Sequence, residues 1–186
     1  MSLTAVLLVD LQRDFLAEKE GRMPIDPSQA ALAVQTANAV LSKAVLPTAI
    51  PIIIVNRFPP KDFFGYLFRR GAAIAGTRGA ELDERIQAPE GTPVFAKSRS
   101  SAFTNAGLGA FLKAHAVTDL VVFGVMAEAC VRVTVKDALR HGYSVRVVSN
   151  ATGSKSRIRK NWALWDMQRA GAGIVPSLLS PPSNLR

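Results

Sequence analysis

Short, continuous runs of apolar residues alternate along this chain with longer segments of helical periodicity. The first run, Thr4–Val9, lacks alternating polar positions, which is typical of a strand covered on both faces in a parallel sheet. Parallel strands need crossover connections, so the helical segments are expected to cover the two faces. We therefore predict an α/β fold with an open parallel sheet. Further strands are predicted at Ile50–Val55, Pro93–Ala96, Leu120–Val125, Ser144–Val148 and Ala172–Val175.

Helix signals lie between these runs. Asp26 followed by Pro27 predicts an N-cap and a first-turn proline, and Gln29 is in the position of a capping-box partner. The apolar periodicity of this helix ends before Pro47. The stretch 56–91 contains a Pro-Pro pair and several glycines, so we predict a loop with short helices there. Other helices are predicted to begin near Thr104 and to span Cys130–Arg140 and Ile158–Arg169.

The chain has 186 residues, which is within the usual size of one domain. We find neither a linker nor an internal repeat, so we predict a single domain over residues 1–186, with its core at about 4–175 and a loose tail at 176–186. No apolar run approaches the roughly 18 residues that span a bilayer. The first residues lack the basic region of a secretory signal. These features predict a cytoplasmic protein with no membrane partner.

The chain is basic, with 23 Lys and Arg against 14 Asp and Glu, a net charge of +9. Such a balance fits nucleic acid, an anionic ligand or a solvated surface. The basic residues lie in short clusters with little aromatic interleaving, and we find no nucleic-acid-binding module. We therefore predict no nucleic-acid partner, and favour an acidic small-molecule substrate or a partner subunit.

Three residues with reactive or charged side chains directly follow predicted strands. Asp10 follows the first strand, Lys97 the third, and Cys130 comes after a tight turn that follows the fourth. Ligands of open α/β sheets bind outside the carboxyl ends of the strands, so these side chains are candidates for one site. A thiol in the first turn of a helix, next to an ammonium group, favours thiolate, and an adjacent carboxylate can transfer its proton. This pattern predicts Cys130 as nucleophile, Asp10 as proton acceptor and Lys97 as their cationic partner.

Each candidate has a structural alternative. A lone cysteine is often inert packing, an Asp at a strand end often caps a turn, and a lone Lys is often a solvated charge. Asp14 and Asp137 are better explained by surface pairing or capping, and the two histidines by helix ends, so none of these is assigned to the catalytic set. The two histidines are His115 and His141.

Several segments together resemble the isochorismatase-like cysteine hydrolases. The resemblance runs from about Thr4 to Val175. It implies a six-stranded parallel sheet in a three-layer, Rossmann-like α/β/α sandwich, a catalytic triad of Asp10, Lys97 and Cys130, and a homo-oligomer, either a dimer or a tetramer. It also implies a cis peptide between Val125 and Met126, with the N–H groups of Met126 and Cys130 forming an oxyanion hole. The matching segments are Val9–Phe15, Gly76–Leu82, Lys97 with Ser101–Phe103, and Gly124–Thr134 with Asp137–Ala138.

One departure from the family pattern concerns metal binding. Members that resemble nicotinamidases carry an Asp-x-His element after the second strand and a further His in the following loop. This chain reads Asn56-Arg57-Phe58 there, with no histidine between Asn56 and Lys97. Sites with few imidazole ligands bind borderline metals such as zinc weakly, so we predict that the protein has no metal and no cofactor. The sequence therefore favours a metal-free amidase over a nicotinamidase.

The substrate is predicted to contact Phe15, Asn56, Phe58 and Val125. The aromatic residues of the following loop could extend this pocket, or could simply pack the loop. Arg69 and Arg70 could also contact the substrate, or could remain solvated. The loop aromatics are Phe63, Phe64, Tyr66 and Phe68.

The leading functional hypothesis is hydrolysis of a small amide, ureido or related C–N bond through a thioester intermediate. Two alternatives remain open. One is an isochorismatase-type vinyl-ether hydrolase that uses Asp10 as an acid and does not need Cys130. The other is a catalytically idle, oligomeric binding module.

Overall fold

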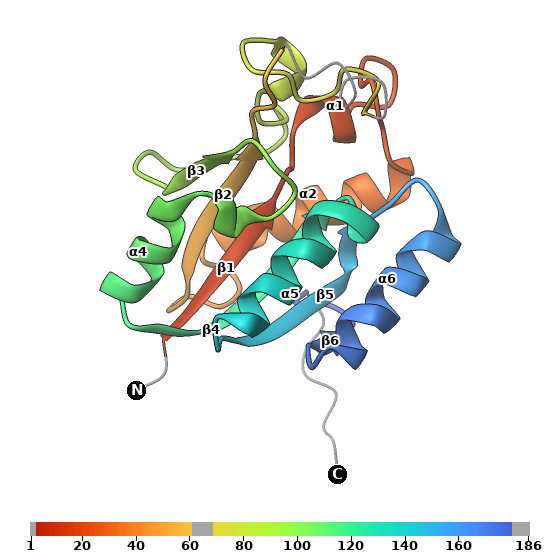
Figure 1. Ribbon diagram of the computed structural model, residues 1–186. Coiled ribbons are helices and arrows are strands. Elements are labelled where there is room, and N and C mark those ends of the chain that lie inside the picture. The colour runs from red at the N-terminus through yellow and green to blue at the C-terminus, as the bar shows by residue number, and fades with distance from the viewer. Residues whose placement is uncertain (1–2, 61–68, 180–186) are drawn as a thin grey trace.

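The computed structural model describes residues 3–60 and 69–179. A single sheet of six strands crosses the molecule in the order β3-β2-β1-β4-β5-β6, and all pairings are parallel. Figure 1 shows β1 at the centre of this sheet. The six-stranded parallel sheet predicted from the sequence is therefore confirmed. The strands are β1 Leu3–Val9, β2 Ile50–Asn56, β3 Val94–Lys97, β4 Val117–Val125, β5 Ser144–Gly153 and β6 Gly173–Val175.

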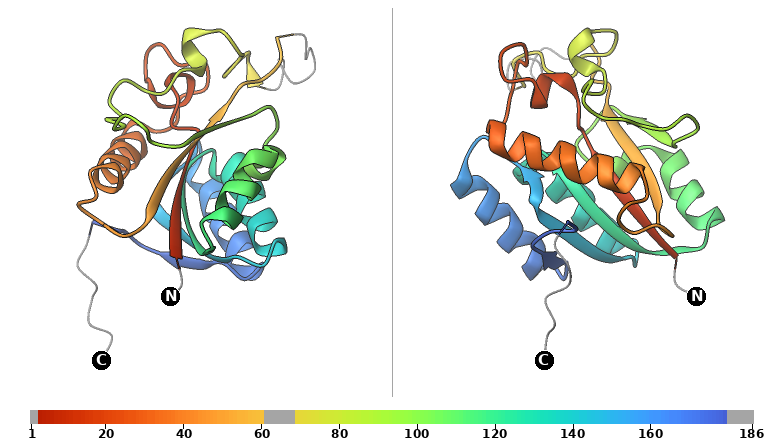
Figure 2. Two further views of the ribbon diagram at one scale, coloured as in Figure 1. Left: turned by 90° about the vertical axis from the view of Figure 1, so that its left-hand side faces the viewer. Right: turned by 180° about the vertical axis from the view of Figure 1, so that it is seen from behind.

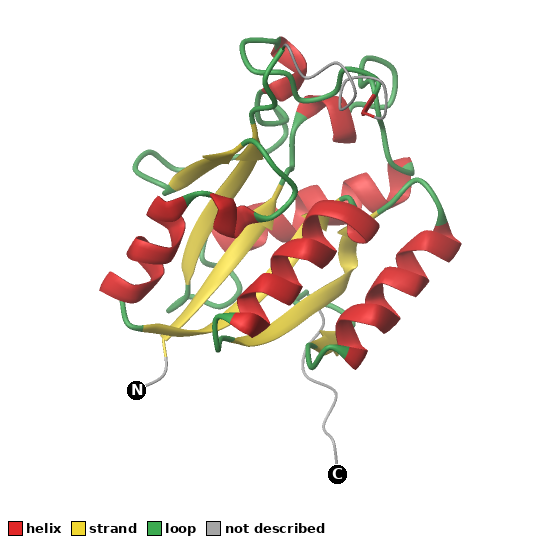
Figure 3. Cartoon of the chain, in the orientation of Figure 1, coloured by secondary structure: helices red, strands yellow, loops and turns green. Residues whose placement is uncertain are grey.

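Helices cover both faces of the sheet. Helix α2 (Pro27–Leu41) lies on one face, whereas α4 (Ala106–Ala114), α5 (Arg132–Arg140) and α6 (Arg157–Arg169) lie on the other (Figure 2). The short helix α1 (Arg13–Leu16) and the loops between strands and helices gather at the carboxyl ends of the central strands (Figure 3). The predicted three-layer α/β/α sandwich is confirmed. Three further short helical turns are η1 Arg78–Ala80, η2 Ala102–Thr104 and η3 Ala127–Val131.

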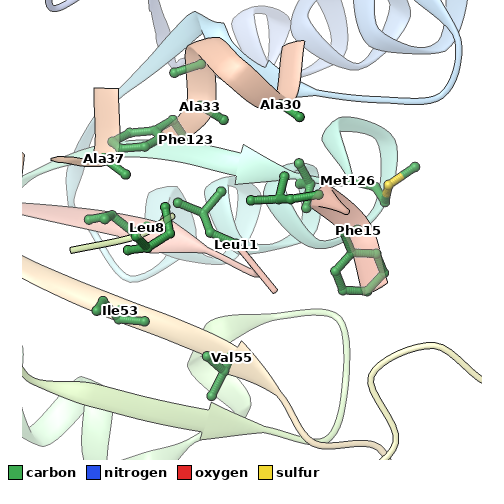
Figure 4. Close-up of a cluster of buried hydrophobic side chains, with 14 of the residues drawn as sticks. Leu8, Leu11, Phe15, Ala30, Ala33, Ala37, Ile53, Val55, Phe123 and Met126 are labelled. Atoms are coloured by element: carbon green, nitrogen blue, oxygen red, sulfur yellow. The ribbon is translucent and has the colours of Figure 1, made fainter. Parts of the chain in front are cut away.

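Successive strand residues point to opposite faces, so the sheet has two cores. Leu8, Ile53 and Phe123 pack with Ala33 and Ala37 of α2 (Figure 4). Their chain neighbours on the same strands pack under α4, α5 and α6. Each fully buried Leu, Ile or Phe side chain contributes on the order of 1.5–3 kcal/mol to folding. This double burial explains why the strands read as continuous apolar runs.

The helix α2 begins as predicted but its capping differs in one respect. The Asp26 carboxylate accepts hydrogen bonds from the N–H groups of Ser28 (2.9 Å) and Gln29 (3.2 Å), which confirms the N-cap. The Gln29 side chain does not complete a capping box. Its amide instead pairs with the backbone of Ser154, which follows β5. The predicted capping-box role was therefore wrong, because a tertiary partner competes for the same amide.

The helix predicted to start at Cys130 begins earlier and is irregular. Residues Ala127–Val131 form a π-helical turn in which the N–H of Val131 donates to the carbonyl of Met126 (3.2 Å), and α5 proper begins at Arg132. Cys130 therefore lies in a widened turn between β4 and α5. Wide turns of this kind recur at functional sites.

The first residues of the predicted tail are held in place. The N–H of Asn150 donates to the carbonyl of Pro176 (3.1 Å), and Leu178 packs against the core under α2. The expectation of a loose tail is therefore wrong for residues 176–179, while 180–186 lie outside the described residues. Within the described parts of the chain, no helix combines the length and apolar character needed to cross a membrane.

The strand order places one crevice at the centre of the sheet. From β1 the chain adds β2 and β3 on one side, and then crosses to place β4 on the other side of β1. Helices after β1 and β4 thus diverge to opposite faces, and the space at the carboxyl ends of these two strands is the topological switch point where open α/β sheets bind ligands. Asp10 follows β1 here, and Cys130 follows β4.

Gly124 allows the two central strands to approach each other. Its φ is +129°, and a Cβ atom built on it would lie 2.0 Å from the carbonyl oxygen of Val9. We predict that Gly124→Ala lowers the free energy of unfolding by about 3 kcal/mol or more, because both the backbone conformation and the contact are unfavourable. Gly109→Ala is the control: a Cβ there meets nothing within 4 Å in α4, and we expect a gain of roughly 0.5–1 kcal/mol. Urea denaturation measures both, and equal effects would contradict this account.

Candidate active site

Asp10 occupies an unusual backbone conformation directly after β1. Its φ is 55°, in the left-handed region that Asp tolerates better than most residues, and its N–H donates to the carbonyl of Ile54 (2.9 Å). The residue is completely buried. The turn thus removes the carboxylate from solvent and directs it into a polar cluster at the end of the sheet.

Lys97, the last residue of β3, reaches the same cluster. Its Nζ donates to Asp10 Oδ2 (2.9 Å), to Asn56 Oδ1 (2.7 Å) and to the carbonyl of Arg99 (3.3 Å). All three ammonium protons therefore have acceptors, and neither side chain of the Lys97–Asp10 ion pair is exposed. The alternative in which Lys97 is a solvated surface charge is wrong.

Asn56, the last residue of β2, connects the charged pair to the thiol. Its Nδ2 donates to Asp10 Oδ2 (2.6 Å) and to Cys130 Sγ (3.5 Å), while its Oδ1 accepts from Lys97. The predictions gave Asn56 a substrate contact. The geometry shows it bonded to all three residues expected to carry the chemistry, which sequence reasoning did not foresee, and the substrate contact stays a prediction.

Gln12 was missed by sequence reasoning although it is part of the segment that resembles the family. It is fully buried, its Nε2 donates to the carbonyl of Asn56 (2.9 Å), and its Oε1 accepts from the N–H of Asn56 (2.8 Å). The same Nε2 also donates to the carbonyl of Ala80 (2.6 Å). Gln12 therefore pairs with the backbone of Asn56 as a neighbouring strand would, and fixes the position of that side chain. An uncharged polar residue three positions after a buried strand was the available signal.

The environment of Cys130 reverses the expectation of a resting thiolate. Burial and the neighbouring Asp10 carboxylate raise the pKa of the Cys130 thiol to about 12, and the opposing effects of Lys97 and Asn56 are smaller. The helix-terminus argument was wrong for the free protein because it left out desolvation, which disfavours the charged form. Both effects favour the protonated form of the thiol.

The charges of the other two residues are also set by burial. Burial raises the pKa of the Asp10 carboxyl, and the positive charge of Lys97 opposes this shift. Burial lowers the pKa of Lys97, but Asp10 and Cys130 outweigh it, so the pKa of the ammonium group stays above its ordinary value. Lys97 is thus positively charged throughout the physiological range, and its charge favours the ionised form of the Asp10 carboxyl.

The turn that follows β4 has the geometry that the resemblance implies. The peptide bond between Val125 and Met126 is cis. The N–H groups of Ala129 and Val131 both donate to the carbonyl of Met126, at 3.0 and 3.2 Å. The backbone of this turn is therefore held by its own hydrogen bonds next to Cys130.

The other predicted substrate contacts lie in the core. Phe15, Phe58 and Val125 are buried in the cluster under α2, and Figure 4 shows Phe15 there beside Met126. Phe15 and Phe58 are each 5% exposed. The Arg69 guanidinium lies 3.7 Å from the centre of the Phe58 ring, which places this cation over the aromatic face. Phe63, Phe64, Tyr66 and Phe68 lie outside the described residues.

Two aspartates left out of the catalytic set have different environments. Asp14 is buried, and its carboxylate accepts from the N–H groups of Ala73 (2.7 Å) and Arg22 (3.2 Å). The prediction of surface pairing was therefore wrong for Asp14. The alternative prediction, that its carboxylate caps backbone N–H groups, agrees with these two hydrogen bonds, which hold two loops together. Asp137 pairs with Arg140 at 2.8 Å on the surface of α5, as expected.

Comparison with known proteins decides the family. The family model described as the Isochorismatase domain matches residues 4–177. The chain belongs to this family. The isochorismatase-family relatives include the uncharacterized protein YddQ of Bacillus subtilis, which is 30% identical over 80% of this chain and 76% of its own length. A protein of Arabidopsis thaliana named "Probable inactive nicotinamidase At3g16190" is 30% identical over 90% of this chain and 89% of its own.

Among solved structures, the N-carbamoylsarcosine amidase of Thermoplasma acidophilum aligns with this isochorismatase-family chain at a TM-score of 0.79 and 26% identity, covering 98% of this chain and 99% of its own. The fold and the full length of the described core are therefore shared with an amidase. Among the described residues of the chain, no group of three or more His, Cys, Asp or Glu side chains is arranged to hold a metal ion.

The raised pKa of the thiol predicts slow alkylation of this isochorismatase-family protein. Iodoacetamide should label Cys130 more slowly at pH 7 than free cysteine, whose pKa is about 8.5, and the rate should rise with pH toward 12. Asp10→Asn should label faster than wild type at the same pH, since the carboxylate charge raises the pKa of the thiol. Mass spectrometry of the single cysteine gives the rates, with Asp137→Asn as a matched control. Wild-type labelling faster than free cysteine would restore the thiolate expectation.

Proposed function

We propose that this protein hydrolyses a small amide, ureido or related C–N bond through a thioester on Cys130. One observation carries the proposal: Asp10, Lys97, Asn56 and Cys130 form a single buried hydrogen-bonded cluster at the topological switch point. The similarity to an N-carbamoylsarcosine amidase over nearly the whole chain supports C–N chemistry. The basic balance of the chain favours substrates that include anionic compounds.

In this proposal Asp10 accepts the thiol proton. Its Oδ2 is engaged by Lys97 and Asn56, and the carboxyl group is also hydrogen-bonded to the Cys130 thiol. The thiol proton passes to this carboxylate as Sγ attacks the carbonyl carbon. Asp10 then gives the proton to the leaving nitrogen, the C–N bond breaks, and the acyl group remains as a thioester.

The second half of the cycle uses the same carboxylate. A water molecule attacks the thioester carbon and gives a proton to Asp10, the C–S bond breaks, and the departing sulfur recovers that proton from Asp10 as the acid is released. The net reaction consumes one water and returns Cys130 to the neutral thiol. No external oxidant or reductant takes part.

Lys97 makes this proton transfer feasible despite the high pKa of the thiol. When the proton moves from sulfur to Asp10, the negative charge shifts in the opposite direction, from the carboxylate to the sulfur, and stays near the same ammonium group. Because Lys97 and Asn56 both favour the thiolate, they stabilise the charge in its new position. The thiolate is therefore formed during attack and not stored beforehand.

The tetrahedral oxygen would be stabilised by backbone donors. We assign this role to the N–H groups of Met126, which precedes the hydrogen-bonded turn after β4, and of Cys130, which lies within that turn. Fixed donors of this kind are effective because they need no reorganisation when the charge develops. We also assign no step to a metal ion or other cofactor.

Two competing functions make different demands on Cys130. A vinyl-ether hydrolase would use Asp10 as an acid and keep its activity without the thiol. An idle binding module would turn over nothing, and a full-length relative is named as a probable inactive nicotinamidase. A complete polar cluster around the thiol favours the hydrolase over both.

We predict that Cys130→Ala, Asp10→Asn and Lys97→Ala each reduce turnover by roughly 10³-fold or more, because members of such a unit do not act independently. Ammonia release from a panel of small amides and ureides measures this. Asp137→Asn and Lys113→Ala are matched controls at exposed or surface-paired positions and should keep wild-type turnover. Full activity in Cys130→Ala would favour the vinyl-ether alternative, and wild-type inactivity across the panel would favour the binding module.

We predict that turnover is indifferent to chelation. Incubation with a chelator followed by buffer exchange should leave the rate of ammonia release unchanged, and elemental analysis of the purified protein should find no stoichiometric zinc or iron. If the chelator abolished activity and a divalent ion restored it, turnover would depend on a metal ion and the metal-free mechanism would be wrong.

A further inference from the structure

A groove lies at the edge of the sheet, outside the Asp10–Lys97–Cys130 cluster. Strand β6 pairs with β5 along Arg146–Val148, whereas β5 continues to Gly153. Helix α6 and the first turn of α2 flank this end of β5, and Figure 2 shows both helices from behind. The groove has a volume of about 700 Å³, and the described residues that line it include no member of the buried cluster. It is therefore a separate cavity, of a size that small molecules occupy.

One flank of α6 supplies cations to this groove. Arg157, Lys160 and Asn161 line it and are spaced i, i+3 and i+4, which brings them to one side of the helix. Lys155, in the turn before α6, lines the same groove. Among the described lining residues the one carboxylate is Asp26, whose oxygen already accepts from N–H groups at the start of α2. The groove therefore has an excess of positive charge.

The ammonium group of Lys160 is partly buried without a partner. Within the described structure, neither Lys160 nor Lys155 has an ion-pair or hydrogen-bond acceptor for its side chain. Burial and the positive charge of Arg157 lower the pKa of Lys160, against the weaker opposing effect of Asp26. Burial and the charge of Arg70 likewise lower the pKa of Lys155. Charges that lose water are normally paired, so an anion in the groove would supply the missing compensation.

Cations elsewhere in the described structure have such partners. On another side of α6, Asp166 accepts from Arg132 (2.9 Å) and from Lys136 (3.0 Å). In the loop before β3, Arg85 donates to the buried Asp83 (2.7 Å). These cations are neutralised by the protein itself. The lysines of the groove are not, which is the difference expected between cations that serve the fold and cations that serve a ligand.

We propose that this groove binds the phosphate group of a small molecule. A phosphate monoester carries a charge of about −2 and presents three strong acceptor oxygens. Lys155, Arg157 and Lys160 can pair with these oxygens, and the hydroxyl groups of Ser149 and Ser177 add donors in the same lining. A carboxylate has one charge and two oxygens, so it would leave part of this set unpaired. The rest of the groove has room for the remainder of the molecule.

Calorimetric titration of the substrate-free protein tests this proposal independently of the hydrolase activity. The probes are inorganic phosphate and glycerol 3-phosphate, with succinate as the carboxylate control, all at constant ionic strength. We expect both phosphates to bind roughly tenfold more tightly than succinate or better. Cys130→Ala should bind them as the wild type does, because the groove is separate from the buried cluster.

Two lysine variants locate the binding site. Lys160→Gln and Lys155→Gln should each raise the dissociation constant for phosphate roughly tenfold or more. The matched control is Lys113→Gln, which removes the same charge from an exposed side chain of α4 and should leave binding unchanged. Lys160→Met should unfold at a higher urea concentration than the wild type when phosphate is absent, because it removes an unpaired charge. Phosphate should then stabilise the wild type but not this variant.

Several results would overturn the proposal. These are no binding of either phosphate up to about 10 mM, equal binding of phosphate and succinate, or equal dissociation constants in Lys160→Gln and Lys113→Gln. A loss of stability in Lys160→Met without phosphate would show that this lysine serves the fold. Binding confined to a long polyanion such as heparin would show that the groove is part of an extended basic surface and not a small-molecule site.

Discussion

Both side chains of the Lys97–Asp10 ion pair are buried, so the surrounding structure has to compensate for the hydration that the two charges lose. Removing two charges from water costs several kcal/mol per ion unless the pair is close and the remaining hydrogen-bonding capacity is used. Here Lys97 donates to three acceptors, and Asn56 binds both members of the pair. Gln12 in turn fixes the backbone of Asn56. The polar residues at the strand ends therefore act as one network, and its stability depends on every member.

The same burial decides the reactivity of the thiol. A Cys at a helix start beside a lysine would be a thiolate in a solvated site, but at Cys130 desolvation and the Asp10 carboxylate outweigh these effects. In the proposed mechanism the thiol and the Asp10 carboxyl share a single negative charge in the field of Lys97. Proton transfer within the cluster then moves this charge a short distance, and the buried site never holds two anions. The arrangement suits a nucleophile that is activated only when a substrate is present.

The topology of the sheet brings these groups together. Asp10, Asn56, Lys97 and Cys130 come from four different strand ends, spread over more than half of the chain. Gly124 lets β4 lie close to β1 at the point where their following segments diverge. Helix α6 contributes to this frame with its inner face, where Ala163 and Met167 are fully buried.

The sequence by itself determined the architecture and the three reactive residues. Continuous apolar strands, the Asp26 cap and the positions of Asp10, Lys97 and Cys130 are local signals, because burial on both faces, capping and strand ends leave a mark on neighbouring residues. Tertiary structure alone decided the bridging role of Asn56, the support from Gln12, the burial of Asp14 and the protonation of the thiol. Each of these depends on contacts between distant segments or on the loss of solvent at one point. Residue type and spacing encode neither the contacts between distant segments nor the loss of solvent. Both arise only when the chain is folded.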